Sequence, residues 1–390
     1  MHLIFATSMV PDGEPKSGYE IANAAILGAF ARAGCRISIV GFAWEGRKSA
    51  LPENAVVLGA LDPRTQGAGL SEKFRWLATA FASGLTFSSA KMRLVSQREV
   101  QSAIEKLGPY DGVIFNSVQF AGAFRHVFDG QPSLYVAHNV EHLSAAQSAN
   151  AARSPVERFL FRREARLLRQ LENDMCSKAR FVYTLSQEDR LLLNISDDER
   201  SAVLPLVSHG PSGASATRDT VYDATLIGTW SWAPNRIGLD WFLQEVVPHL
   251  PEDFAIAIAG DAPPSLQAAY PHVSFVGRVP DAISFVRSGR VVPLISRAGT
   301  GVQLKTIETF EQGLPSVATS SALRGISYKP ENCILADDPQ DFAEALVKSA
   351  AGAPRDADGS AFHAAQRSAL DKAVLRGLVK AGFAPQRKPA

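Results

Sequence analysis

Short apolar runs alternate with longer amphipathic segments along most of the chain. In the first half, runs rich in Val, Ile and Phe predict buried strands at residues 2–6, 36–42, 112–116, 133–137 and 180–186. Runs of this length and composition are typical of parallel strands covered on both faces. Residues 18–34 carry apolar positions at helical spacing and end at Gly34, which predicts a helix with glycine just beyond its last turn.

The second half repeats this alternation after residues 207–221, a linker candidate rich in Gly, Ser, Thr and Pro. Strands are predicted at 222–230, 253–260, 272–277, 290–295, 314–320 and 332–337, and helices at 235–250, 279–289, 302–313 and 359–383. The pattern predicts an α/β protein of two Rossmann-like, doubly wound domains facing each other across a cleft. We expect an N-terminal domain over 1–207, a C-terminal domain over 208–359, and a last helix, about 360–390, that packs back on the first domain.

Composition narrows the class of protein. A chain of 390 residues is long enough for two cores, and 46% hydrophobic with 20% charged residues is typical of a globular protein. The net charge of +1 gives no indication of a nucleic-acid partner. Three scattered cysteines form neither a metal-binding spacing nor a disulfide framework. Because the N-terminus lacks a signal-peptide pattern and no apolar run approaches about 20 residues, we expect a cytoplasmic protein.

The stretch GTGVQLKTIETFEQG, residues 299–313, is the strongest candidate site. Gly299, Thr300 and Gly301 follow a predicted strand and can expose consecutive backbone N–H groups to a ligand. The next helix would point its positive end at the same spot, with Lys305 and Glu308 one turn apart on one face. An anion at the helix start and a sugar hydroxyl on the carboxylate would suit this arrangement. The alternative is a strand-to-helix turn with an ordinary ion pair.

Three further corners carry glycine after a predicted strand in the second half. In residues 227–238, Gly228 and Thr229 could approach a ligand closely, Asn235 is a candidate helix N-cap, and Arg236 is a further cation. In open α/β sheets ligands bind beyond the carboxyl ends of strands, where these corners lie. Glycine is also common at such corners for packing reasons, so both interpretations stay open.

The order and spacing of these segments over residues 222–350 resemble the donor-binding half of GT-B fold glycosyltransferases, particularly glycosyltransferase family 4. The N-terminal half is similar more loosely, in its first corner and helix and in VAHNVEH, residues 136–142. The resemblance implies a nucleoside diphosphate sugar, in the UDP or GDP form, as co-substrate. It also implies transfer with retention of anomeric configuration, without a bound metal or other cofactor.

The resemblance assigns roles to particular residues of the second half. Glu308 matches the glutamate that contacts the nucleotide ribose, whereas Thr300 stands where the family has the glutamate that contacts the donor sugar. The backbone around Arg278 and Val279 is expected to meet the base. The donor diphosphate and sugar are expected at Gly299, Thr300, Gly301, Lys305, Arg236, Gly228 and Thr229.

In the first half, His138 follows a predicted strand and is the candidate catalytic residue. By the resemblance it lies near the donor sugar, where a neutral imidazole can donate to a hydroxyl or orient an acceptor. The alternative is a strand-end histidine bonded to the backbone. His142 has the spacing of a metal pair with His138, but without a third ligand we expect no metal. On the acceptor side, Gly18, Tyr19 and Glu20 either line the site or only cap a helix.

Two segments, residues 71–98 and 156–174, mix large apolar side chains with Lys and Arg. Such segments can lie on an anionic membrane, or they can pack one face on their own domain. We therefore expect a glycosyltransferase that acts on a saccharide or a lipid-linked saccharide acceptor, in bacterial surface polysaccharide synthesis, with peripheral contact at the inner face of the membrane. The alternatives are a sugar-nucleotide epimerase of the same fold and a non-catalytic sugar-nucleotide binder, which the absent first glutamate favours.

Overall fold

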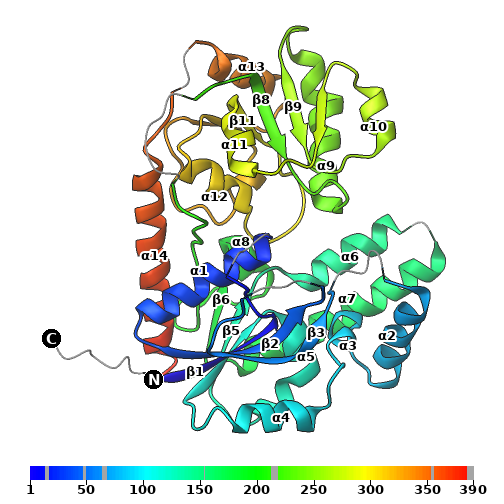
Figure 1. The fold of residues 1–390 in the computed structure, drawn as a ribbon, viewed down its shortest axis with the longest axis vertical. Coiled ribbons are helices and arrows are strands. Elements are labelled where there is room, and N and C mark those ends of the chain that lie inside the picture. The colour runs from blue at the N-terminus through cyan, green and yellow to red at the C-terminus, as the bar shows by residue number, and fades with distance from the viewer. Residues whose placement is uncertain are drawn as a thin grey trace, which may run out of the picture. The chain divides into compact units, whose positions relative to one another are not determined.

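A computed structural model of the chain describes residues 1–13, 17–46, 50–63, 68–152, 154–211, 218–352 and 355–383. It divides into two compact units, each a layer of strands covered by helices (Figure 1). Unit 1 comprises Met1–Leu204 and Ala369–Ala390, and unit 2 comprises Pro205–Ser368. The two Rossmann-like domains predicted from the alternation of apolar runs are thus confirmed.

Unit 1 contains a seven-stranded sheet in which all neighbouring strands pair in parallel. In spatial order its strands are β3 (Ala55–Leu61), β2 (Arg36–Trp44), β1 (His2–Met9), β4 (Gly112–Asn116), β5 (Ser133–Ala137), β6 (Phe181–Thr184) and β7 (Ser201–Val203). All five strands predicted in the first half are present. The two outer strands were not predicted, because only the last residue of β3 is buried and β7 has only three residues, so neither forms a buried apolar run.

Helices cover the sheet of unit 1. They are α1 (Gly18–Arg32), α2 (Leu70–Ala82), α3 (Phe87–Lys91), α4 (Gln97–Glu105), α5 (Val118–Phe124), α6 (Glu141–Ala151), α7 (Pro155–Lys178) and α8 (Gln187–Leu192), with a 3-10 turn at Arg125–Phe128. The predicted first helix is confirmed: Ser17 caps its start, and Gly34 follows its end with φ +84°. The core between sheet and helices includes Phe115, Tyr135 and Phe120, all buried.

Unit 2 contains a six-stranded parallel sheet. Its spatial order is β10 (Ser274–Gly277), β9 (Ile256–Ala259), β8 (Tyr222–Ile227), β11 (Gly289–Leu294), β12 (Ser316–Ala318) and β13 (Cys333–Leu335). All six predicted strands are present, and all but β11 are shorter than predicted. In each unit the first strands are added on one side of the starting strand, β1 or β8, and the later strands on its other side. The strand order therefore reverses between β1 and β4 and between β8 and β11.

The helices of unit 2 are α9 (Ala233–Trp241), α10 (Pro264–Ala269), α11 (Ala282–Arg287), α12 (Leu304–Glu311) and α13 (Pro339–Ala350), with a 3-10 turn at Ser320–Leu323. The helix predicted over 235–250 changes character along its length. After α9 it continues as a π-helical turn, Phe242–Val246, and a 3-10 turn, Val247–His249. Pro248 has no N–H to continue the α-helical ladder there. Asn235 is not the N-cap, because α9 begins after Trp232.

The last helix, α14 (Gly359–Lys380), contributes its first residues to unit 2 and the remainder to unit 1. In unit 1, Asp371 pairs with Arg32 at 2.6 Å, and the Tyr183 hydroxyl donates to the Val374 carbonyl at 3.0 Å. The packing of α14 on the first domain, expected for about residues 360–390, therefore applies to the helix from Ala369 onward. Of the linker candidate at 207–221, residues 212–217 lie outside the described part of the chain.

Cys35, Cys176 and Cys333 are buried free thiols. Among the described residues, no group of three His, Cys, Asp or Glu side chains is arranged to hold a metal ion. The described helices also include none that is both long enough and apolar enough to cross a membrane.

Glu311 holds three segments of unit 2 together. Its carboxylate is fully buried and accepts hydrogen bonds from the backbone N–H groups of Ser208 (2.8 Å) and Gly210 (3.0 Å) and from the Ser208 hydroxyl. The His363 ring nitrogen Nδ1 lies 2.9 Å from the same carboxylate. Glu311 thus joins α12 to the start of unit 2 and to α14.

We predict that Glu311→Ala destabilises unit 2 by about 2–4 kcal/mol, because the buried N–H of Gly210 and the part-buried N–H of Ser208 lose their acceptor. Urea unfolding of the purified protein measures this change. Glu331→Ala, at an exposed position in the same unit, is the control and should shift stability by less than about 0.5 kcal/mol. Equal unfolding midpoints for the two variants would contradict the role given to Glu311.

Candidate donor site

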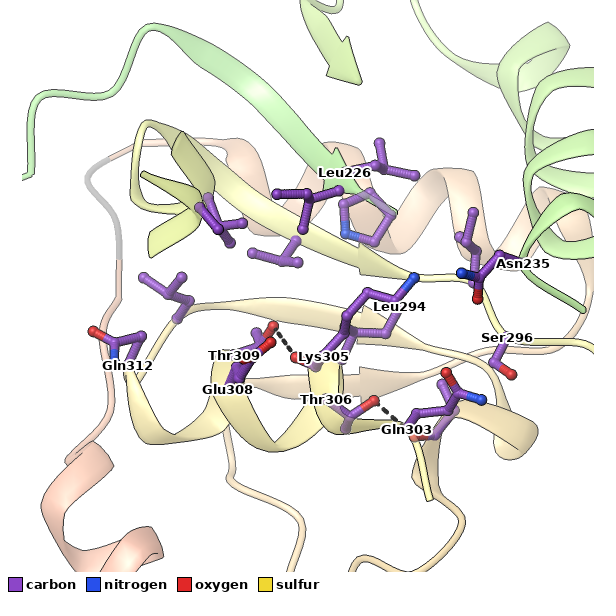
Figure 2. A pocket seen from close by; sticks show the side chains of 18 of the residues that line it. Leu226, Asn235, Leu294, Ser296, Gln303, Lys305, Thr306, Glu308, Thr309 and Gln312 are labelled. Carbon is purple, nitrogen blue, oxygen red and sulfur yellow. Dashed lines mark hydrogen bonds between the residues drawn. The ribbon is translucent and has the colours of Figure 1, made fainter. Parts of the chain in front are cut away.

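A pocket in unit 2 lies where the strand order reverses, between the ends of β8 and β11 and against helices α9, α11 and α12. Figure 2 shows Leu226 on one side of it and Lys305, Glu308 and Thr309 of α12 on the other. Its residues are Leu226, Ile227, Trp230, Pro234, Asn235, Ala282, Ile283, Val286, Val292–Ser296, Gln303, Lys305, Thr306, Glu308, Thr309, Gln312, Leu314 and Ala322. Apolar walls with a few convergent polar groups are typical of a small-molecule site.

Lys305 is the cation of this pocket. It lies in the first turn of α12, and its Nζ is 5.3 Å from the centre of the Trp230 ring. Burial lowers the pKa of its ammonium to about 8, and the nearby Glu308 opposes this shift. At neutral pH the ammonium therefore remains charged while partly removed from water. A charge in that condition attracts an anionic ligand more strongly than an exposed lysine does.

Glu308 lies one turn further along α12 and also lines the pocket. Burial raises the pKa of its carboxyl group to about 7; Glu311 adds to this shift and Lys305 opposes it. Both side chains are described, yet Lys305 and Glu308 make no direct ion pair. The ion pair of the alternative interpretation is therefore absent, and each group presents its own chemistry to the pocket.

Packing explains the glycines that follow β8 and β9, Gly228 and Gly260. Trp230 donates its indole N–H to the Ala259 carbonyl at 2.9 Å. A Cβ on Gly228 would lie 2.7 Å from the indole ring, and a Cβ on Gly260 would lie 2.0 Å from the Gly228 carbonyl oxygen. These glycines let two strand ends and an indole approach closely. They thereby place Trp230 beneath Lys305.

Several residues predicted to bind the donor lie outside the pocket lining. Arg236 pairs with Asp240 on α9 at 2.7 Å, and Arg278 pairs with Asp261 at 2.6 Å on the surface. Gly228, Thr229, Val279, Gly299, Thr300 and Gly301 do not line the pocket either. Gly299 and Gly301 do adopt positive φ, +92° and +76°, as expected of a glycine-rich loop. Gly299 lies beside Pro234, which lines the pocket, because a Cβ there would be 3.3 Å from the proline ring.

Sequence reasoning missed several polar groups of the pocket: Trp230, Asn235 as a lining residue, Ser296, Gln303, Thr309 and Gln312. The side-chain amide of Asn235 donates to the Thr229 carbonyl at 3.1 Å, which holds the loop before α9. Gln303 is the N-cap of α12, Thr309 lies within the helix and Gln312 is its C-cap, so the spacing from Lys305 and Glu308 was the signal available for them.

In unit 1, the candidate residue His138 follows β5 and is buried. Its Nε2 lies 2.7 Å from Oδ1 of Asn116, the last residue of β4. The Tyr19 ring packs on the imidazole, with 5.1 Å between ring centres. Burial lowers the pKa of His138 to about 4, so the ring is neutral at physiological pH. The described hydrogen bond of Nε2 thus goes to a side chain and not to the backbone of the alternative interpretation.

His142 and His138 have different hydrogen-bond partners. Its Nδ1 lies 2.6 Å from the carboxylate of Glu172 on α7. The same carboxylate accepts the backbone N–H groups of Glu141 and His142 at 2.7 and 3.2 Å, so Glu172 caps the start of α6. Burial is the main cause that raises the pKa of Glu172, to about 7. The i,i+4 spacing of the two histidines therefore places them in two separate hydrogen-bond networks.

On the predicted acceptor side, α1 begins at Gly18. Glu20 is buried and accepts a hydrogen bond from the Ser17 hydroxyl at 2.9 Å, while its backbone N–H donates to the same hydroxyl. Glu20 therefore takes part in capping the helix. Tyr19 instead directs its hydroxyl toward Thr7 Oγ1, at 2.8 Å, next to Asn116.

Comparisons with known proteins agree on the fold, and a family model matches most of unit 2. Residues 223–351 match the family model described as glycosyl transferases group 1. Sucrose-phosphate synthase from Thermosynechococcus elongatus superposes with a TM-score of 0.60 at 15% identity, covering 97% of this chain and 96% of that one. Anabaena Alr3699/HepE in complex with UDP-glucose gives 0.57 at 15% identity and 98% coverage of both chains.

WaaG, a glycosyltransferase involved in lipopolysaccharide biosynthesis, gives a TM-score of 0.53 at 14% identity, covering 98% of both chains. No curated protein matches the chain by sequence. The chain has the GT-B fold that its sequence predicts, and residues 223–351 of unit 2 match the group 1 model.

We predict that Gly260→Ala destabilises the protein by about 3 kcal/mol or more, because its Cβ would collide with the Gly228 carbonyl and its φ is +108°. Thermal or urea unfolding measures the loss. Gly277→Ala is the matched control, since its φ of +68° is also positive but no atom lies within 4 Å of the added Cβ. The control should cost about 1 kcal/mol. A similar loss in both variants would show that the close approach beneath Trp230 is not required.

Proposed function

We propose that the protein is a glycosyltransferase that moves a sugar from a nucleoside diphosphate sugar to a saccharide or lipid-linked saccharide. The observation that carries this proposal is the pocket of unit 2. In this pocket the partly desolvated side chains of Lys305 and Glu308 lie among apolar side chains. The pocket falls within residues 223–351, which match glycosyl transferases group 1. The complexes of Anabaena Alr3699/HepE with UDP and with UDP-glucose support a nucleotide sugar as the ligand class.

The chemistry of the pocket fits the parts of such a donor. The Lys305 ammonium would bind the diphosphate and stabilise the charge that develops as it leaves. The Glu308 carboxylate would accept hydrogen bonds from the ribose hydroxyls. The apolar side chains of Ala282, Ile283 and Val286 on α11 offer an apolar contact for the base. We place the acceptor on unit 1, near His138 and Tyr19.

The reaction is proposed to retain the anomeric configuration without a bound metal. The departing diphosphate would then take the proton of the acceptor hydroxyl, with no protein nucleophile at the sugar carbon. Thr300 supplies a hydroxyl where a carboxylate is expected toward the donor sugar, which favours the second candidate, a non-catalytic sugar-nucleotide binder. Surface polysaccharide synthesis in the cytoplasm of a bacterium is the setting that we propose.

We predict that Lys305→Ala weakens UDP binding about tenfold or more at pH 7, since a charged hydrogen bond to the diphosphate is lost. Calorimetric titration with UDP, GDP and their sugars measures the affinities. Because the pKa of Lys305 is about 8, the affinity of the unmodified protein should fall as pH rises from 8 to 9.5. The variant should lack this pH dependence.

Lys348→Ala, on an exposed position of α13, is the control and should bind as the unmodified protein does. Release of nucleoside diphosphate on addition of a saccharide or lipid-linked acceptor would establish transfer. Tight binding without release on any acceptor would establish the binder, and interconversion of donor sugars without an acceptor would establish the epimerase. Unchanged UDP affinity in Lys305→Ala would overturn the assignment of the pocket.

A surface of unit 1 supports peripheral membrane contact. Leu70, Phe74 and Phe81 lie along one exposed stripe of α2, and Leu70 and Phe74 are 86% and 73% exposed. At the C-terminal end of this stripe, the guanidinium of Arg163 on α7 lies 4.3 Å from the centre of the Phe81 ring. The adjoining face of α7 exposes Val156, Phe159, Arg158, Arg162 and Arg166. Arg158, Arg162 and Arg166 form no ion pair with a described residue.

Unpaired arginines beside exposed aromatic side chains are suited to an anionic lipid surface, which attracts the charges and accepts the apolar groups. We propose that this surface, formed by α2 and the first half of α7, binds the membrane that presents a lipid-linked acceptor. The charges and apolar side chains would act together, so the contact should weaken at high salt.

We predict that the protein sediments with vesicles containing phosphatidylglycerol and not with pure phosphatidylcholine vesicles. The double variant Phe74→Ser with Phe159→Ser, and the double variant Arg162→Glu with Arg166→Glu, should each lower vesicle binding about tenfold or more. Leu375→Ser, an exposed apolar position on α14, is the control and should bind normally. Sedimentation of both double variants at the level of the unmodified protein would exclude this surface.

A further inference from the structure

One end of the pocket in unit 2 is polar but has no role in the function proposed above. That function gives the diphosphate to Lys305 and the ribose to Glu308, and it gives the sugar to no residue of the pocket lining. Figure 2 shows Asn235, Ser296 and Gln303 toward one end of the pocket, which we call the neutral end. Glu308 lies toward the other end, and Lys305 lies between the two. The neutral end is built from three segments: the start of α9, the loop after β11 and the N-cap of α12.

The side chain of Gln303 has no structural role that explains it. Gln303 is only 8% exposed and is the N-cap of α12, yet its side chain makes no capping hydrogen bond. Glutamine is also not among the residues that favour this position. The amide forms no hydrogen bond with any described residue. A buried amide without a partner costs free energy, and a ligand in the pocket that Gln303 lines would supply the partner.

Asn235 and Ser296 add further uncharged polar atoms to this end. The amide nitrogen of Asn235 donates to the Thr229 carbonyl at 3.1 Å. Because a carbonyl only accepts, the nitrogen faces Thr229 and the amide oxygen remains as an acceptor. The Ser296 hydroxyl can both donate and accept. The two segments pack closely, since a Cβ on Gly238 of α9 would lie 2.3 Å from the carbonyl oxygen of Ile295.

The charges of the lining indicate which kind of sugar this end fits. Lys305 and Glu308 are the only charged side chains among the described residues that line the pocket, and neither belongs to the neutral end. Sugar hydroxyls both donate and accept, so amides and hydroxyls match them without a charge. A carboxylate or ammonium on the sugar would lose hydration there, while the diphosphate already occupies Lys305. An uncharged sugar therefore fits this end best.

The positions along α12 match the order of groups in a nucleoside diphosphate sugar. An α-helix rises about 1.5 Å per residue, so Gln303, Lys305 and Glu308 are spread over about 7–8 Å along the helix axis. In such a donor the diphosphate lies between the ribose and the sugar. With the ribose at Glu308 and the diphosphate at Lys305, the sugar is directed toward Gln303.

We propose that Gln303, together with Asn235 and Ser296, binds the sugar of the donor and makes the site selective for an uncharged, hydroxyl-bearing sugar. The Gln303 amide donates to one sugar hydroxyl and accepts from another. Gln303 determines the specificity, because a site whose buried polar groups are completed by the substrate rejects analogues that leave those groups unpaired. This inference rests on the proposed function, from which it takes the placement of the ribose and the diphosphate.

Calorimetric titration of the full-length protein with UDP and UDP-glucose, and with GDP and GDP-mannose, tests this assignment. The quantity compared is the Kd of the nucleotide divided by the Kd of its nucleotide sugar. Gln303→Leu removes the amide and keeps a side chain of similar size. We expect this ratio to fall about tenfold or more in Gln303→Leu, with the Kd of the nucleotide changed by less than about twofold. Ser296→Ala should lower the ratio to a smaller extent.

Gln340→Leu, at an exposed position of α13, makes the same replacement outside the pocket and should leave the ratio unchanged. Equal weakening of nucleotide and nucleotide sugar in Gln303→Leu would show that Gln303 contacts a part that both share, which overturns the proposal. Normal nucleotide binding with an unchanged ratio overturns this inference alone. Absence of binding by both nucleotides overturns the proposed function, and this inference with it.

UDP-glucuronic acid tests the class of sugar in the same titration. We expect it to bind about tenfold more weakly than UDP-glucose, because its carboxylate meets no second cation at the neutral end. Binding of UDP-glucuronic acid as tight as that of UDP-glucose, or tighter, would overturn the selectivity for an uncharged sugar.

The stability of the protein without ligand separates a binding role of Gln303 from a structural one. Because its amide has no partner among the described residues, Gln303→Leu should leave the midpoint of urea unfolding unchanged or raise it. A lower midpoint than that of Gln340→Leu would show that the amide supports the fold, which would overturn the proposal.

Discussion

The parallel sheets decide where the candidate site residues of this protein lie, because the carboxyl ends of neighbouring parallel strands lie at one edge of the sheet. Where the strand order reverses, the connections leave to opposite faces of the sheet, and a gap remains that no connection fills. The reversal between β8 and β11 holds the pocket of Lys305 and Glu308, and the reversal between β1 and β4 holds the cluster of Asn116 and His138. Both sites are therefore consequences of topology before they are consequences of particular side chains.

Partial removal from water gives these side chains their properties. In the pocket, burial moves the pKa of Lys305 down and that of Glu308 up, so the two groups titrate close to neutral pH without a direct ion pair. In unit 1, burial keeps His138 neutral. Charged groups held in this condition lose less hydration when a ligand arrives, and they interact with it across a lower effective dielectric. The cost of holding them is met by packing, for which the contact of Lys305 with Trp230 is one example.

The two glutamates of α12 show how far sequence reasoning reaches. Glu308 and Glu311 are three residues apart on a helix of eight, and their sequence context is similar. Glu308 lines the pocket, whereas Glu311 is fully buried among the N–H groups of Ser208 and Gly210 and the ring of His363. The partners of Glu311 are about 50 and 100 residues away in the chain, so no local pattern distinguishes a ligand-facing carboxylate from a structural one.

The sequence by itself determined the alternation of strands and helices and the division into two Rossmann-like domains, because periodicity and glycine corners are local properties. The GT-B class followed from the resemblance of residues 222–350 to a known family. The sequence also determined Lys305 and Glu308 as neighbours on one helical face. Only the tertiary structure decided that Gly228 and Gly260 serve the packing of Trp230, that Arg278 pairs with Asp261, and that Asn116 holds His138. Those outcomes depend on which residues the fold brings close together in space although they are far apart in the sequence. Hydrogen bonds and van der Waals contacts form only over a few ångströms, so the sequence pattern alone does not reveal them.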